Sequence, residues 1–126
     1  MTYRAFADKL LDLAEYRAEE IAKRWYKAVS ENPRTPSYRS LPKEQCILRA
    51  ASVYKNLKQL FFTENPYQAV LDFLERTRYA EDLYAEGVPL PEVIYALIMM
   101  RRHIWLYAEF QAVLSTAMDM HKEAES

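Results

Sequence analysis

Glycine is nearly absent from this chain. The 126 residues contain only Gly87, whereas an average composition of about 7% glycine would supply roughly nine. Loops that cradle phosphates and two-residue hairpin turns both depend on glycine, because it has no side chain and tolerates a positive φ. The sequence therefore disfavours glycine-rich phosphate-binding loops and β-hairpins.

Cysteine, charge of one sign and long apolar runs are also scarce. The single cysteine, Cys46, cannot form an internal disulfide, and no secretion signal is recognisable near the N-terminus. Seventeen Lys and Arg residues against eighteen Asp and Glu residues leave a net charge of −1, so we expect no nucleic-acid partner. The longest apolar run has eight residues, and a membrane span needs about 18. We expect a cytoplasmic protein without membrane insertion.

Four segments carry apolar residues at every third or fourth position, which is the pattern of the buried face of an α-helix. The pattern predicts an all-α fold with four main helices, packed as an antiparallel helical bundle or in a globin-like arrangement. Residues 1–126 are expected to form one helical domain, since this length suits a single core. The four predicted helices span residues 6–29, about 42–63, about 65–86, and from Leu90 onward for about 30 residues.

Proline and glycine set the predicted helix boundaries. Asn65 and Pro66, with Gln68 three residues after Asn65, have the pattern of a capped helix start. Gly87 is the expected end of the third helix, because glycine tolerates the left-handed conformation that commonly closes a helix. Pro91 is well placed in the first turn of the last helix. Gly87 and Pro91 therefore define the structural turn before that helix.

The last predicted helix is apolar on two sides. Thirteen of the sixteen residues 93–108 are apolar or aromatic, and only Arg101, Arg102 and His103 interrupt them. A bundle of three short neighbours buries one side easily, so the second side predicts a homodimer interface. The alternative is a central helix surrounded by its own chain. The first side carries Val93, Leu97, Met100 and Ile104; the second carries Ile94, Ile98, Trp105 and Leu106, with Ile94, Tyr95 and Ile98 predicted at the interface.

No pattern of catalytic residues is recognisable, so we expect no enzyme. His103 and His121 are 18 residues apart on one predicted helix, a rise of about 27 Å that excludes a shared metal site, and no metal or cofactor is expected. Cys46 lies early in a predicted helix, where Lys43 and Arg49 would lower its thiol pKa. A buried, inert thiol is the commoner situation for a lone cysteine.

His103 and its neighbours form the candidate ligand or signal neighbourhood, which we place at Arg101, His103 and Trp105. An apolar and aromatic setting suits a histidine that ligates haem, so a haem-binding gas sensor that uses His103 is one alternative. The other interpretation is that His103 merely continues the polar strip of the two preceding arginines. A purely structural assembly module without any ligand is a further alternative.

Part of the sequence resembles a known protein family. Residues 84–97 (YAEGVPLPEVIYAL), continuing to RRHIW at 101–105, resemble the final helix-turn-helix of the N-terminal sensory domains of RsbT co-antagonist (RsbRD-type) proteins. Residues 21–25 (IAKRW) fit the first helix of those domains. The most distinctive matches are Trp25, the turn at Gly87, Glu92 and Arg101.

The resemblance implies a non-haem, globin-like bundle that dimerises and passes an environmental signal to a downstream output domain or protein. Related domains resemble the input segments of some histidine kinases, and the family belongs to bacterial stress-response signalling. The sequence therefore predicts a non-catalytic signal-input domain that is homodimeric through its last helix, with the sensed signal left open.

Overall fold

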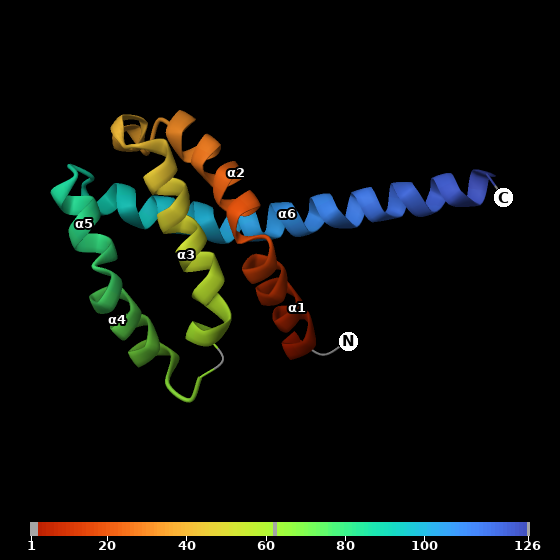
Figure 1. Ribbon diagram of the computed structural model, residues 1–126, viewed down its shortest axis with the longest axis horizontal. Helices are drawn as coiled ribbons and strands as arrows, with labels where there is room; N and C mark the ends of the chain where they lie inside the picture. The colour runs from red at the N-terminus through yellow and green to blue at the C-terminus, as the bar shows by residue number, and fades with distance from the viewer. Residues whose placement is uncertain (1–2, 62, 126) are drawn as a thin grey trace.

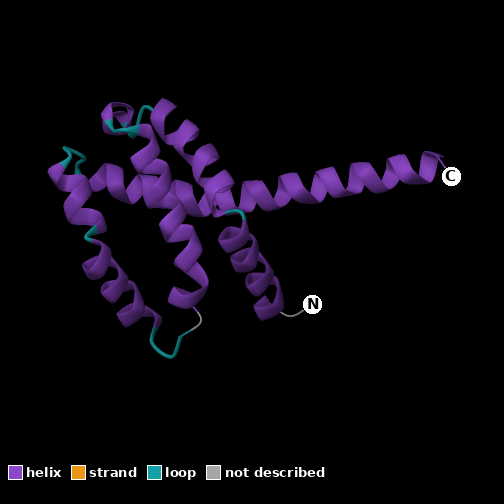
Figure 2. Cartoon of the chain, viewed as in Figure 1, coloured by secondary structure: helices purple, strands orange, loops and turns teal. Residues whose placement is uncertain are grey.

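The structure, a computed structural model, describes residues 3–61 and 63–125, and side chains at 7–60, 63–112 and 115–119. Every regular element in these ranges is a helix (Figure 2), which confirms the all-α prediction. None of these helices combines the length and the hydropathy that a membrane crossing requires. The elements are α1 (Tyr3–Tyr16), α2 (Ala18–Glu31), the 3-10 helix η1 (Pro36–Ser40), α3 (Lys43–Phe61), α4 (Pro66–Thr77), α5 (Tyr79–Ala85) and α6 (Leu90–Glu125).

The prediction of one continuous helix over residues 6–29 is wrong, because the chain breaks at Arg17 between α1 and α2. The backbone stays hydrogen-bonded through the break: Arg17 N–H donates to the Leu13 carbonyl (2.8 Å), and the Arg17 carbonyl accepts from Ile21 N–H (3.0 Å). No proline or glycine lies there. The bend instead lets α1 and α2 each pack against α3 and α6 in different directions (Figure 1).

The third predicted helix, over residues 65–86, is likewise two helices. Arg78 has φ 53° and ψ 37°, the left-handed conformation, so α4 ends there and α5 starts at the next residue. L-residues adopt this conformation at a cost of about 1–2 kcal/mol, and the sequence offers no glycine or asparagine to indicate it. The described residues therefore form six α-helices rather than four.

Boundaries that rest on proline and glycine are confirmed. The Asn65 side chain accepts a hydrogen bond from Gln68 N–H (3.2 Å), as a helix cap does. Gly87 has φ 93°, and its N–H donates to the Tyr84 carbonyl (3.0 Å). With Pro91 in its first turn, α6 begins at Leu90 and extends over 36 residues. The expected long C-terminal helix is therefore present.

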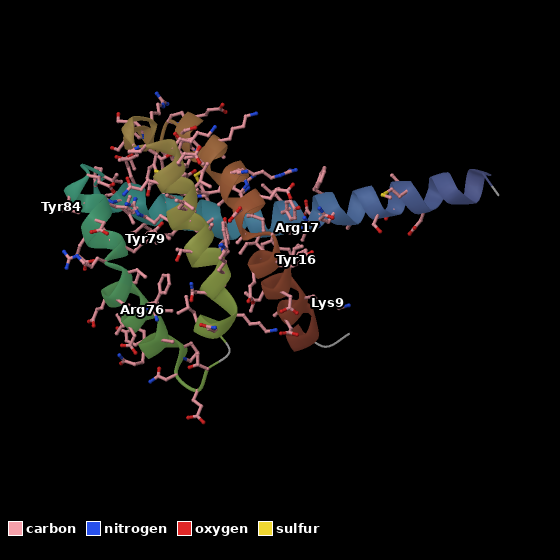
Figure 3. The ribbon with its side chains drawn as sticks, in the orientation of Figure 1. Lys9, Tyr16, Arg17, Arg76, Tyr79 and Tyr84 are labelled. Carbon is pink, nitrogen blue, oxygen red and sulfur yellow. The ribbon has the colours of Figure 1, made fainter. Side chains whose placement is uncertain are left out.

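The bundle is built across the first half of α6. Helices α2 and α3 lie side by side across α6, α5 packs against its start, and the second half of α6 projects away from the other helices (Figure 1). The core includes the fully buried Trp25, Tyr54 and Leu83. Tyr79 on α5 is also buried, whereas Tyr84 near the outer end of the bundle is exposed (Figure 3). Most of the described buried residues form one cluster, to which the buried Leu60 and Phe73 do not belong.

Buried polar groups fix α6 in place. The Trp25 indole N–H donates to the Ala96 carbonyl (2.9 Å), and the Tyr54 hydroxyl donates to the Met100 carbonyl (2.8 Å). At the start of α6, the Glu92 carboxylate accepts from both the backbone N–H (2.8 Å) and the hydroxyl (2.6 Å) of Ser37 in η1. These bonds hold α6 against α2, α3 and η1 at defined points along its length.

Replacing Arg78 with glycine tests the strain at the break between α4 and α5. The substitution relieves the left-handed strain and removes only an exposed ion pair with Asp82 (3.8 Å), so we expect Arg78→Gly to raise the free energy of unfolding by about 0.5–1 kcal/mol. Arg17→Gly is the matched control, because φ is −109° there, and we expect it to lower stability by a similar amount. Urea unfolding, followed by circular dichroism, measures the free energy of unfolding of both variants. If Arg78→Gly lowers it as much as Arg17→Gly does, the backbone at Arg78 is not strained.

Candidate functional site

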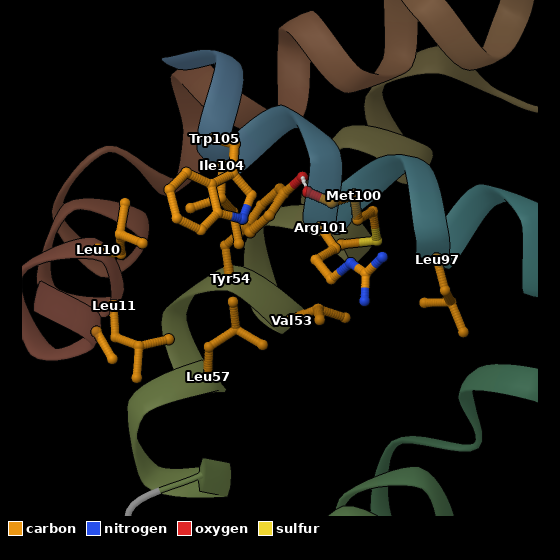
Figure 4. A pocket seen from close by; sticks show the side chains of 11 residues that line it. Leu10, Leu11, Val53, Tyr54, Leu57, Leu97, Met100, Arg101, Ile104 and Trp105 are labelled. Carbon is orange, nitrogen blue, oxygen red and sulfur yellow. Dashed lines mark hydrogen bonds between the residues drawn. The ribbon is translucent and has the colours of Figure 1, made fainter. Parts of the chain in front are cut away.

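An apolar cavity of about 470 Å³ lies between α1, α3 and α6 (Figure 4). This volume is within the range of small-molecule binding pockets, roughly 300–1,000 Å³. Ten of its eleven lining residues carry no charge. They are Ala7, Leu10 and Leu11 from α1; Val53, Tyr54 and Leu57 from α3; and Leu97, Met100, Ile104 and Trp105, with the charged Arg101, from α6.

The α1 wall of the cavity depends on the break at Arg17, since α1 packs on α3 and α6 independently of α2. Lys58 on α3 ties the two helices together, because its ammonium group lies 3.2 Å from the Asp8 carboxylate and 2.7 Å from that of Asp12. These ion pairs are exposed and hold the helices only weakly. Leu11 turns a second apolar side of α1 toward the cavity, next to Leu10.

Arg101 is the single charged side chain among the described residues that line the cavity. It is exposed, and its guanidinium extends past Met100 on the side where Val53 and Leu97 lie (Figure 4). Within the described ranges, no acceptor forms a hydrogen bond or ion pair with this guanidinium. A cation without a protein partner beside an apolar cavity makes the site amphipathic, with an apolar interior and a positively charged rim.

Tyr54 has the only hydroxyl group in the described part of the lining. Its proton is donated to the Met100 carbonyl on α6 (2.8 Å, dashed in Figure 4), and the residue is fully buried. Burial raises the pKa of Tyr54 far above its ordinary value of 10.0, with the neighbouring Tyr79 adding to the effect. The hydroxyl therefore stays neutral and is already engaged, which leaves Arg101 as the polar group for a ligand.

The predicted neighbourhood of Arg101, His103 and Trp105 is only partly brought together. Arg101 and Trp105 both line the apolar cavity, and Trp105 is 46% exposed. His103 lines a separate cleft with Arg102, Glu31 and Asn32, beside the end of α2. The prediction that these three residues form one site is therefore wrong for His103. An apolar ligand in the larger cavity has no access to the imidazole.

The imidazole of His103 is half-buried. Burial lowers the pKa of His103 below its ordinary value of 6.5, and the nearby guanidinium groups of Arg102 and Arg24 lower it further. All of these effects disfavour the charged form.

The three predicted interface residues do not share one environment. Ile94 and Ile98 are 50% and 51% exposed and lie one helical turn apart on α6. Tyr95 is partly buried against the core, and the guanidinium of Arg34 lies 5.6 Å from its ring centroid. The exposed side of α6 thus includes the two isoleucines, whereas Tyr95 packs within its own chain.

The remaining candidate chemistry is buried and structural. Cys46 is 2% exposed, and burial raises the pKa of its thiol despite the opposing effect of Arg49, so the inert interpretation holds. Arg49 instead pairs with the Glu86 carboxylate (3.0 Å). No group of three or more His, Cys, Asp or Glu side chains in the described part of the chain is arranged to hold a metal ion. The geometry of the site suits binding.

Sequence reasoning missed most of the cavity. Leu10 and Leu57 lie at helical spacings that are typical of a buried face, but the structure leaves both partly buried beside an open volume. The doublet Leu10–Leu11 was an available signal, because two adjacent apolar residues cannot both face one neighbour on a helix. That signal indicates a second apolar side of α1, but not what lies against it.

Substitutions of Arg101 and Arg102 test the cause of the lowered His103 pKa. Because its pKa is lower in the folded than in the unfolded chain, protonation favours unfolding, and His103 lowers stability as pH falls below about 6.5. We expect Arg102→Gln to raise the His103 pKa, whereas Arg101→Gln, facing the other cavity, changes it less. An NMR titration of the imidazole C–H signals measures this. A His103 pKa above 6.5 in the unchanged protein would contradict the burial described.

Comparison with protein-family models found no match, and comparisons with curated proteins and with solved structures found none either. The resemblance to RsbRD-type sensory domains therefore stays a prediction. Three of its four distinctive residues have structural roles here: Trp25 and Glu92 fix α6, and Gly87 forms the turn before it. Arg101, the fourth, is at the cavity.

Proposed function

We propose that this chain is a non-catalytic signal-input domain that forms a homodimer through α6 and acts on a downstream output domain or protein. The observation that carries the proposal is an apolar side of α6 that its own chain leaves uncovered. Ile94, Ile98 and Trp105 on this side are 46–51% exposed. The exposed Leu106 and Phe110 lie roughly 80–120° farther round the helix from Ile98, and the Arg24 guanidinium lies 4.6 Å from the centroid of the Phe110 ring.

Uncovered apolar side chains in such a row are unusual for a soluble monomer. A scattered single residue needs no explanation, but a contiguous apolar patch typically marks an interaction site. On the opposite side of α6, Val93, Ala96 and Met100 are already buried in the bundle. A second copy that presents the same row is the simplest partner, since two-fold symmetric contacts are self-complementary.

The second half of α6 supports the same partner. This half runs past the bundle and has no neighbouring helix within the described chain (Figure 1). Isolated helices shorter than about 12–15 residues are marginal in water, so most helical stability comes from packing. Ala112, Ala117 and Met118 supply exposed apolar positions on this half, while the side chains of Leu114 and Met120 lie outside the described residues. A paired stalk would supply the missing packing.

Signal transmission follows from the position of the cavity beside this interface. Arg101 and Trp105 line the cavity, and Trp105 also belongs to the uncovered row. A ligand that binds one dimer arrangement more tightly shifts the population toward it, by no more than its differential affinity. Because α6 continues into the projecting stalk, a small shift at the bundle displaces whatever is attached beyond it. The resemblance to RsbRD-type domains agrees with this role.

A charge placed in the row tests the dimer. We expect Ile98→Glu to raise the dimer dissociation constant about tenfold or more, since the substitution would bury an unpaired carboxylate at the interface with the second protomer. Leu48→Glu is the matched control, because Leu48 is equally apolar and 65% exposed but lies on α3. Light scattering across a concentration series measures both. A monomer at tens of micromolar, or equal effects of the two substitutions, refutes the proposed dimer.

A further inference from the structure

We propose that the cavity between α1, α3 and α6 binds a single-chain amphiphilic carboxylate, with its apolar part inside and its carboxylate on Arg101. This inference rests on the proposed function, because it names the ligand class that the input domain would sense. Binding itself is measured independently of dimerisation, so the two proposals fail separately.

The interior of the cavity selects for an apolar ligand body. Apart from Arg101, the Tyr54 hydroxyl and the Trp105 indole are the only polar side-chain groups among the described residues of the lining. The Tyr54 proton is already donated to the Met100 carbonyl, and Trp105 has an interaction of its own. A sugar or nucleotide in this volume would leave several polar groups without partners, and each would cost free energy. An alkyl chain or a ring carries no such penalty.

The rim selects for an anion. The Arg101 guanidinium has no acceptor within the described ranges, and the lining residues that the structure describes include no Asp or Glu. A guanidinium presents its N–H groups as a planar fork that matches a carboxylate in two parallel hydrogen bonds. A cationic amphiphile would meet repulsion at this rim, and a neutral one would gain no charge-assisted hydrogen bond from the guanidinium.

The volume limits the size of the ligand. About 470 Å³ lies in the lower half of the range for small-molecule pockets, which suits one medium-length chain or a small ring system. A lipid with two long chains would exceed it. The competing occupant is an apolar side chain from a second copy, because the uncovered row of α6 adjoins the cavity at Trp105.

Isothermal titration calorimetry with decanoate and decanol, each below its micelle-forming concentration, separates these possibilities. Both probes share the apolar chain, and only decanoate carries the charge. The variants are Arg101→Gln and, as the matched control, Arg102→Gln, which removes an exposed arginine that faces the other cleft. Ala7→Met, on the α1 wall, narrows the cavity without touching Arg101. Circular dichroism establishes that each variant is folded.

We expect decanoate to bind the unchanged protein more tightly than decanol. Arg101→Gln should weaken decanoate about fivefold and leave decanol unchanged, because one solvent-exposed charge-assisted contact is lost. Arg102→Gln should leave both probes unchanged, and Ala7→Met should weaken both. The proposal is overturned if decanoate does not bind, if decanol binds as tightly as decanoate, or if the two arginine variants behave alike.

The Ile98→Glu variant keeps the two proposals apart. We expect it to bind decanoate with little change while dimerising less, since Ile98 does not line the cavity. Loss of decanoate binding by this variant would instead mean that a second copy of the protein completes or occupies the cavity. That result would overturn the proposal that one protomer binds the ligand by itself. Absence of a dimer with intact decanoate binding would refute the proposed function alone.

Discussion

Helix α6 is held by hydrogen bonds from buried aromatic side chains to its own backbone. The Trp25 indole and the Tyr54 hydroxyl reach the carbonyls of Ala96 and Met100, two positions about one helical turn apart. Together the two bonds restrict the rotation of α6, because Ala96 and Met100 lie on the same side of the helix. A helix that is apolar on two sides would otherwise have no unique orientation in the bundle. These two bonds decide which side is buried.

That orientation has a functional consequence. With one side of α6 against α2 and α3, the row that includes Ile98 is left uncovered, and Arg101 is brought to the rim of an apolar cavity. Trp105 belongs to both the cavity and the row, so in this account a ligand in the cavity would alter the dimer contacts of the row. In the proposed account, recognition and dimerisation are therefore linked through a single rigid helix, and no separate relay is needed.

Much of the fold could be predicted from the sequence, and the misses have identifiable physical causes. Asn65, Gly87 and Pro91 mark helix boundaries through their own backbone chemistry, which local sequence reveals. Arg17 and Arg78 interrupt helices without a proline, glycine or asparagine at the break, so the local sequence does not reveal them. The candidate site was half predicted. Arg101 and Trp105 are four residues apart and share a side, whereas His103 is rotated from Arg101 by about 200° and faces another cleft.

The central claim is that α6 is covered on its second side by another copy of the chain. Hydrogen exchange of α6 amides over a range of protein concentrations tests it most directly. The account predicts that protection in the projecting second half of α6 rises with concentration toward that of the first half, because the second half has no packing partner within the described chain. Rapid exchange of the projecting half at every concentration would contradict it.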